Sequence, residues 1–243
     1  MRQGTTVTRM TPLGPSVLHA RPELDKVVHR PDLLDRVRYA GSHGGTPVFF
    51  LQTVIAEAAD REKGVDPQTT LHADTFHPTS KAWLFLHDVG IDDGPFAYVP
   101  GSHRLTEKRL EWEYAQSLTA CSDKRSHHAQ GSFRIEPDGL PALDLPPPMP
   151  VTVAANTLVV ADTFGFHGRT PSSRPTIRVE LHGHMRRNPF HPWTGLDFKS
   201  LPGIGDRALD LFLMEQDARE KYLGKRTIWR DVGEVAIDSP AHI

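Results

Sequence analysis

The sequence predicts a mainly β protein, a barrel or a sandwich with flanking helices. Short segments rich in β-branched and aromatic residues recur along the 243-residue chain, and turn residues separate them every eight to twelve positions or so. The 21 prolines disfavour a mostly helical fold, because proline breaks helix interiors. A chain of this length suits one such domain, so we expect residues 1–243 to form a single domain.

The expected strands define a barrel core at about residues 47–185. The segments with strand composition are Pro47–Ala56, Thr70–Phe76, Lys81–Val89, Phe96–Val99, Pro150–Ala154, Thr157–Asp162 and Thr176–His184. An N-terminal arm over residues 1–45 precedes this core, and a C-terminal helical extension over about residues 204–224 follows it. The core and its two flanking segments form the single expected domain.

Apolar residues at helical spacing predict three helices. They cover Pro31–Tyr39, Leu105–Leu118 and Asp206–Leu223. Charged residues that include Arg109 predict a solvated face on the second helix. The third helix is expected either to pack on the barrel or to form a homodimer contact.

Composition excludes several classes of protein. The chain has 28 Lys+Arg and 30 Asp+Glu, and its net charge of −2 argues against nucleic acid as a partner. The single cysteine, Cys121, excludes a disulfide scaffold and a thiolate zinc finger within one chain. The first ten residues lack the apolar core of a signal peptide, and the apolar runs are too short to cross a membrane. We therefore expect a cytoplasmic protein with no membrane partner.

The triplet His72-Ala73-Asp74 is a candidate metal-binding pair. Residues i and i+2 of a strand face the same side, so both side chains can bind one ion. A 2-His-1-carboxylate iron site needs such a pair and one more histidine from elsewhere. The triplet alone is uninformative, because a chain with 14 histidines contains one by chance. The alternative is a surface histidine beside a solvated aspartate.

The context of the triplet carries more information. Residues 94–104 are Gly-Pro-Phe-Ala-Tyr-Val-Pro-Gly-Ser-His-Arg, and a second motif extends from Asn156 through His167 to Arg178. At these residues the chain resembles the phytanoyl-CoA dioxygenase family of Fe(II)- and 2-oxoglutarate-dependent oxygenases. Four features match in order: the His-x-Asp triplet, a following strand with Trp83, the Pro-Gly-Ser-His turn, and a distal histidine with an arginine eleven residues later. The resemblance covers about residues 48–185.

The resemblance implies a fold and a set of site residues. The implied fold is a double-stranded β-helix, a jelly-roll or cupin-like barrel, with the metal at its mouth. His72, Asp74 and His167 would be the catalytic iron ligands, Arg178 would bind the far carboxylate of 2-oxoglutarate, and Trp83 would line the cosubstrate pocket. O₂ would be the second cosubstrate. An arginine suits a buried carboxylate because its guanidinium is a bidentate donor that stays charged.

Other residues near the expected site have two possible roles, one structural and one functional. Phe76, Tyr98, Phe164 and Phe166 are either barrel core or a hydrophobic wall for the substrate. Arg169 stands where relatives often have a small polar residue, so it is also a pocket candidate. The pair His182-x-His184 is an alternative metal site, or lines the far end of the barrel. The pair His127-His128 lies in a polar segment and is expected to be solvated.

These observations predict an Fe(II)- and 2-oxoglutarate-dependent dioxygenase with a small-molecule substrate, such as one of secondary metabolism. The expected reaction is hydroxylation of an unactivated C–H bond, with release of succinate and CO₂. Asp74 occupies the position that is vacant in halogenating relatives, which favours hydroxylation or desaturation over halogenation. Two alternatives stay open: a barrel that binds metal or a small molecule without turnover, and a zinc hydrolase with the same ligands.

Overall fold

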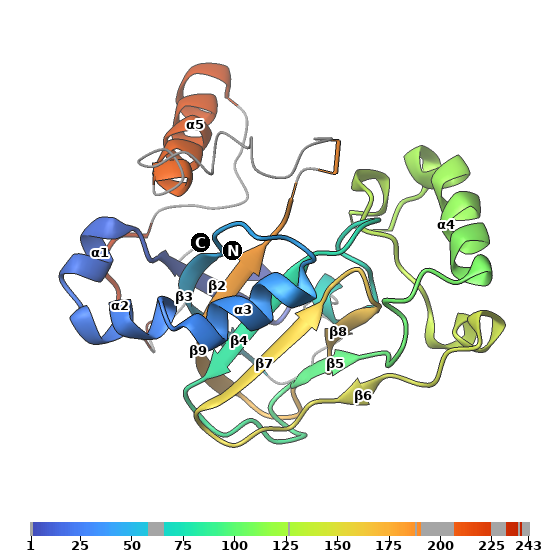
Figure 1. Cartoon of the computed structure of the whole chain (residues 1–243), viewed down its shortest axis with the longest axis horizontal. Helices are drawn as coiled ribbons and strands as arrows, with labels where there is room; N and C mark the ends of the chain where they lie inside the picture. Colours follow the sequence, from blue (N-terminus) through green and yellow to red (C-terminus); the bar gives the residue numbers. More distant parts are fainter. Residues whose placement is uncertain are drawn as a thin grey trace.

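Two antiparallel β-sheets form the centre of the protein (Figure 1). In this computed structural model, residues 2–57, 66–125, 127–187, 189–190, 207–224, 232–237 and 239 are described. The larger sheet has the order β1 (Arg2–Gln3), β2 (Thr6–Pro12), β3 (Val48–Ala56), β9 (Thr176–Met185), β4 (Ser80–Phe85) and β7 (Thr157–Asp162). The smaller sheet has the order β6 (Met149–Pro150), β5 (Phe96–Tyr98) and β8 (His167–Arg169). This architecture confirms the mainly β, jelly-roll barrel with flanking helices.

Strand β9 connects the two halves of the larger sheet. It pairs with β3 along nine residues and with β4 along six. Successive side chains of a strand point to opposite faces. Arg178, Glu180 and His182 therefore face the interior between the sheets, while Leu181 and Met185 pack into the apolar core on the other face. Both faces are covered, which explains why most of β9 is buried.

Three short helices cover the outer face of the larger sheet (Figure 1). They are α1 (Pro15–His19), α2 (Pro22–Val28) and α3 (Pro31–Ala40), and each begins with proline, whose missing N–H costs nothing in the first turn. Leu33 and Val37 of α3 join Leu181 and Met185 in one buried cluster. The sequence predicted α3 but neither α1 nor α2, because these helices are too short to show a period.

The N-terminal residues are part of the sheet. Strand β2 pairs with β3 at every residue of β3 except Val48 and Phe49. The expected N-terminal arm over residues 1–45 did not include this strand. Thr6 and Thr8 are buried. The strand was missed because a sequence pattern identifies a strand by apolar residues at its buried positions, and these positions are polar. Residues 1–45 thus contribute an edge of the larger sheet as well as its helical cover.

The remaining helices lie outside the sheets. They are α4 (Glu107–Thr119), α5 (Ala208–Leu223) and the 3₁₀ turns η1 (Pro67–Thr69), η2 (Ala120–Ser122), η3 (His128–Gln130), η4 (Pro137–Gly139) and η5 (Pro141–Leu143). Both α-helices were predicted. The solvated position of Arg109 was wrong: its side chain is buried, pairs with Glu113 at 2.8 Å and lies over the rings of Phe164 and Phe166. Within the described ranges no helix has the length and apolar character needed to cross a membrane.

The strand expected at Thr70–Phe76 is irregular. Only His72 forms β-bridges there, one with Arg134 and one with His167. The strand expected at Pro150–Ala154 is likewise reduced to β6 and an isolated bridge at Val153. The bridge between His72 and His167 brings two distant parts of the chain together at the edge of the smaller sheet.

Candidate metal centre

His72, Asp74 and His167 lie together as one possible set of metal ligands. Each offers one donor atom, and these atoms lie within 4.8 Å of one another. The backbone groups of His72 and His167 exchange two hydrogen bonds of 2.9 Å, which places the two imidazoles side by side with ring centroids 4.5 Å apart. Asp74 is two residues after His72, and its N–H donates to the carbonyl of Thr163. Local backbone pairing therefore positions all three side chains.

Both histidines present the same ring nitrogen to the shared space. His72 Nδ1 donates to the Thr70 carbonyl at 2.8 Å, and His167 Nδ1 donates to the Gly165 carbonyl at 2.9 Å. These bonds leave the Nε2 atoms unprotonated and facing Asp74. Burial lowers the pKa of both imidazoles below their usual range, so they are neutral at physiological pH. Neutral imidazole is the form that binds a metal ion.

Asp74 stays ionised in this buried setting. Burial raises the pKa of a carboxyl group, but the Lys81 ammonium offsets that effect and holds the pKa of Asp74 below its usual value. Lys81 Nζ lies 2.6 Å from Asp74 Oδ2. The sequence analysis did not single out Lys81. The available signal was its strand parity with Trp83, which also faces the interior.

A cavity of about 200 Å³ lies between the two sheets beside His167. Its polar lining residues come from β1, β2, β3, β4, β8 and β9 and from η1. The lining residues are Gln3, Thr8, Met10, Gln52, Gln68, Lys81, Trp83, Phe85, Phe96, His167, Gly168, Arg169, Arg178, Glu180 and His182. Three of these side chains are cationic, and each pairs with a carboxylate: Lys81 with Asp74, Arg169 with Asp66 and Arg178 with Glu180. The two guanidinium groups are donors of the kind that bind a carboxylate ligand.

Arg178 is held rigidly in the wall of this cavity. Its Nη1 donates to the Gly94 carbonyl at 3.0 Å, and its Nε lies 2.8 Å from Glu180 Oε2. The Gly94 φ of +65° favours glycine, and a Cβ at Gly94 would lie 2.9 Å from the Thr170 carbonyl. Glu180 is fully buried and accepts a 2.5 Å hydrogen bond from Gln52 Nε2. The orientation of the Arg178 guanidinium is therefore set before any ligand binds.

Arg169 lines the same cavity as Arg178. It is two residues after His167 on β8, so both side chains face the interior. Its Nη2 lies 2.6 Å from Asp66 Oδ2. Its Nε is buried and has no hydrogen-bond acceptor within the described residues. This nitrogen is available to a ligand.

The aromatic candidates separate into three environments. The Trp83 ring lines the cavity, with centroid distances of 4.6 Å to Phe96 and 5.5 Å to His182. Phe164 and Phe166 lie in the core beneath α4, because the turn that contains them faces Arg109. The remaining two candidates lie elsewhere around the site. The Tyr98 hydroxyl donates to the Asp162 carbonyl, and Phe76 is 53% exposed, with its ring tilted against that of Phe190 at a centroid distance of 6.1 Å.

His182 lines the cavity, as its parity with Arg178 predicted, and His184 lies opposite Lys81 in the register of β9 and β4. His128 is different. The sequence predicted that it is solvated, and this was wrong, because its side chain is fully buried. Its Nδ1 accepts a 3.2 Å hydrogen bond from the Arg134 N–H.

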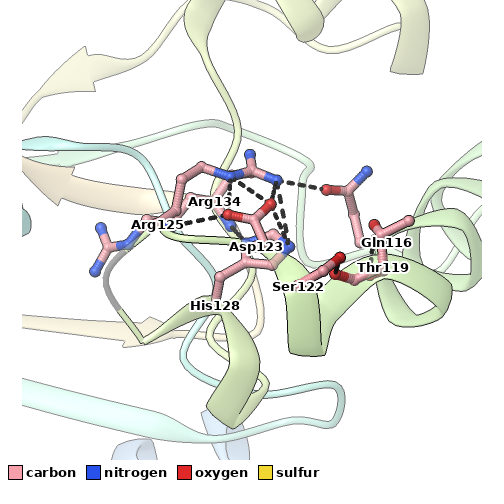
Figure 2. Close-up of polar contacts among 7 residues, drawn as sticks. All are labelled: Gln116, Thr119, Ser122, Asp123, Arg125, His128 and Arg134. Atoms are coloured by element: carbon pink, nitrogen blue, oxygen red, sulfur yellow. Dashed lines mark hydrogen bonds and ion pairs between the residues drawn. The ribbon is translucent and has the colours of Figure 1, made fainter.

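Figure 2 shows the polar network around His128. Arg125 connects its parts: its guanidinium pairs with Asp123 at 2.6 Å and donates to Gln116 Oε1 on α4 and to the Arg134 carbonyl. The backbone on either side of Arg134 bonds to the chain on either side of His72, through Ala73 N–H to Phe133 O and Ile135 N–H to Leu71 O. The network therefore supports the segment that carries two of the three candidate ligands.

The fold and this site define a class of barrel proteins with a candidate metal centre beside a cavity lined by two arginines. The model of the phytanoyl-CoA dioxygenase (PhyH) family matches residues 15–138, just over half of the chain. The chain belongs to this family, and the resemblance in its sequence is confirmed. The His–Asp–His set has the donor types of a 2-His-1-carboxylate iron site.

Comparison with solved structures gives similar chains at low identity. AviO1 from Streptomyces viridochromogenes is 20% identical, with a TM-score of 0.42 over 72% of this chain and 64% of that chain. The α-ketoglutarate-dependent epimerase SnoN from nogalamycin biosynthesis is 19% identical, with a TM-score of 0.47 over 82% and 71%. Iron-bound HygX from Streptomyces hygroscopicus is 18% identical, with a TM-score of 0.41 over 74% and 72%.

The similarity covers only part of some of these proteins. The chain spans less than two thirds of AviO1 and 32% of EvdMO1. At these TM-scores the similarity bears on neither substrate nor reaction. No curated protein matches the chain.

Proposed function

We propose that this protein is an Fe(II)- and 2-oxoglutarate-dependent dioxygenase that hydroxylates an unactivated C–H bond of a small molecule. One observation carries the proposal: His167 of the candidate ligand set lines the same cavity as the Arg169 and Arg178 guanidinium groups. A 2-oxo dicarboxylate needs a metal for one end and a cation for the other. This cavity offers both.

His72, Asp74 and His167 would hold the iron. The donor set suits the ion, since two neutral imidazoles and one carboxylate are the ligands of the facial triad. The buried His167 Nε2 has no hydrogen-bond partner within the described residues, so a ligand for it is expected. When bound, iron supplies the chemistry by which O₂ and 2-oxoglutarate convert a C–H bond to an alcohol, with one oxygen atom in the product and the other in succinate, as CO₂ is released.

The protein's own residues would bind and orient the cosubstrate. Arg178 would take its far carboxylate, with the guanidinium already oriented by Gly94 and Glu180. Arg169 would donate from its free Nε, and Trp83 would cover the carbon chain. Residues two apart on a strand are about 6.6 Å apart, so the spacing of His167 and Arg169 suits a short dicarboxylate.

Hydroxylation is the reaction that the ligand set favours. Asp74 fills the position that a halide would need, so halogenation is disfavoured, and we expect Asp74→Gly to abolish normal turnover. Phe76, exposed beside the site, would form part of the wall for the substrate. We also propose a cytoplasmic location and, through the exposed apolar side chains of α5, a homodimer.

The test is succinate formation from 2-oxoglutarate by protein loaded with Fe(II) without oxygen and then exposed to air with ascorbate. Wild-type protein should form succinate, and His72→Ala and Arg178→Ala should not. Because such enzymes can idle without substrate, anaerobic binding of 2-oxoglutarate to the Fe(II) protein is measured in parallel by its charge-transfer absorption. Wild-type protein that does not bind 2-oxoglutarate would contradict the proposal. Hydrolytic activity with zinc and no oxygen would favour the hydrolase instead.

A further inference from the structure

Lys81 is a cation that faces the interior directly beside the candidate metal ligands. It lies on β4, the strand between β9 and β7, and points to the same side as Trp83 and Phe85. Only 21% of its side chain is exposed. An ammonium group among aromatic side chains is costly unless it has an anionic partner. Its partner is Asp74, and no other member of the candidate ligand set can neutralise it.

The two carboxylate oxygens of Asp74 have different neighbours. Oδ2 lies 2.6 Å from Lys81 Nζ. Oδ1 lies 3.8 Å from His72 Nε2 and 3.7 Å from His167 Nε2. The carboxylate is therefore rotated so that one oxygen faces the space shared with the imidazoles and the other binds the ammonium.

We propose that Lys81 is a positioning residue that holds Asp74 as a metal ligand through one oxygen only. The inference rests on the proposed function and adds a residue that the metal-ligand motif does not contain. Lys81 occupies Oδ2, so Oδ1 alone is free for the ion. Hydrogen-bonded outer partners of this kind orient ligands and support metal affinity.

This arrangement matters for the number of open metal positions. Two imidazoles and one carboxylate oxygen would take three of the six positions of an octahedral ion, and three would stay open. A 2-oxo acid would fill two of these positions and leave one for O₂. If Asp74 bound through both oxygens, the cosubstrate would fill the last two positions, and none would be left. Lys81 thereby protects the position that the reaction needs.

The opposite role for Lys81 makes the opposite prediction. If the ammonium merely balances Asp74 while no metal is bound, it repels an arriving cation, since like charges repel. Removal of the ammonium would then tighten metal binding. In the positioning role, removal weakens binding.

The experiment compares Lys81→Met with wild-type protein, and Lys108→Met is the matched control. Lys108 also pairs with an aspartate at 2.6 Å, but Lys108 and Asp144 are on the surface. Co(II) is titrated calorimetrically into each full-length, metal-free protein without cosubstrate, and the visible absorption spectrum of the Co(II) protein is recorded. We expect Lys81→Met to weaken Co(II) binding about 10- to 100-fold and to change the spectrum, because Asp74 is no longer held in one orientation. Lys108→Met should match wild-type protein in both respects.

Three results would overturn the inference. Unchanged affinity and spectrum in Lys81→Met would show that Lys81 does not orient Asp74, and tighter binding would show that it acts as a competing cation. Wild-type protein that binds no Co(II), or binds it equally well as His72→Ala, would overturn the proposed function and the role of Lys81 with it. If Lys81→Met does not fold by circular dichroism, Lys81→Leu replaces it, with the same expected weakening and the same spectral change.

Discussion

Substitution of Arg169 tests whether this side chain binds the cosubstrate. Its Nη2 is held by Asp66 at 2.6 Å, while its buried Nε faces the cavity without an acceptor. A hydrogen bond to a charged group contributes about 1.5–3 kcal/mol, so Arg169→Ser should weaken 2-oxoglutarate binding about 10- to 100-fold. The measurement is an anaerobic titration of metal-loaded protein, followed by charge-transfer absorption. A 2-oxo acid without the second carboxylate should lose far less affinity.

Arg174→Ser is the matched control for this prediction. Arg174 pairs with Asp93 at 2.7 Å, but its own side chain is 65% exposed, and an ion pair to such an exposed arginine contributes little. Its affinity for 2-oxoglutarate should equal that of wild-type protein. Equal affinity in Arg169→Ser as well would mean that Arg169 only balances the charge of Asp66.

The site residues that the sequence revealed are those with local signals. Strand parity within His72-Ala73-Asp74 and the eleven-residue spacing from His167 to Arg178 are visible in the chain. The structure brings the triplet and His167 together, and Arg178 lies in the same cavity as His167. Lys81 and His128 were not recognised, because each depends on partners that the fold supplies from elsewhere. A buried ion pair has no periodic pattern in either of its members.

Strands with a local sequence pattern were also predicted correctly, and strands without one were missed. β7 contains the apolar run Leu158–Ala161, and in β9 Ile177, Val179 and Leu181 alternate with polar residues, so their bounds were predicted almost to the residue. β8 has three residues and β2 buries threonines, so neither shows a period. Propensity also failed at residues 70–76, where a strand composition gives only isolated bridges because the chain must turn His72 and Asp74 into one space.

The segment around His128 supports the chain that carries His72 and Asp74, so a change in this segment should affect the metal site. His128→Leu leaves the buried Arg134 N–H without its acceptor, which costs about 1–3 kcal/mol of stability. Metal affinity should fall as well, since the neighbouring backbone bonds to the chain beside His72. Urea unfolding and Co(II) titration measure the two effects.

His127→Asn is the control for this element. His127 is exposed and has a φ of +60°, a conformation that asparagine tolerates. Neither stability nor Co(II) affinity should change measurably. Reduced stability of His128→Leu with unchanged metal affinity would mean that the segment supports the fold but not the ligands.

At the scale of the whole molecule, metal binding should stabilise the fold. The three candidate ligands come from two parts of the chain almost a hundred residues apart, so the unfolded chain offers no preformed site. Binding to the native state alone adds about 2.7 kcal/mol at a metal concentration 100 times the Kd. Removal of metal by a chelator should lower the melting temperature, and His72→Ala should lose this dependence. An unchanged melting temperature in wild-type protein would contradict a native metal site.

The metal-free protein should also lose stability in mild acid. Five buried histidines, His72, His77, His128, His167 and His182, have pKa values that burial lowers, in His182 to about 3. In the unfolded chain their pKa is about 6.5. Below that pH the unfolded chain therefore binds protons that the native protein does not, so the free energy of unfolding falls as the pH falls. Each histidine contributes up to about 1.4 kcal/mol per pH unit.

Urea unfolding of metal-free protein at a series of pH values between about 7.5 and 5.5 measures this effect, because the interval contains the unfolded pKa. The midpoint should fall steadily below pH 6.5 or so, and His182→Phe should reduce the slope, because it removes one titrating group and keeps an aromatic ring against Trp83. An equal slope in that variant would mean that His182 titrates alike in the folded and unfolded states. Since a bound ion would hold His72 and His167 unprotonated, acid should also release the metal, and the metal-loaded protein should show the steeper decline.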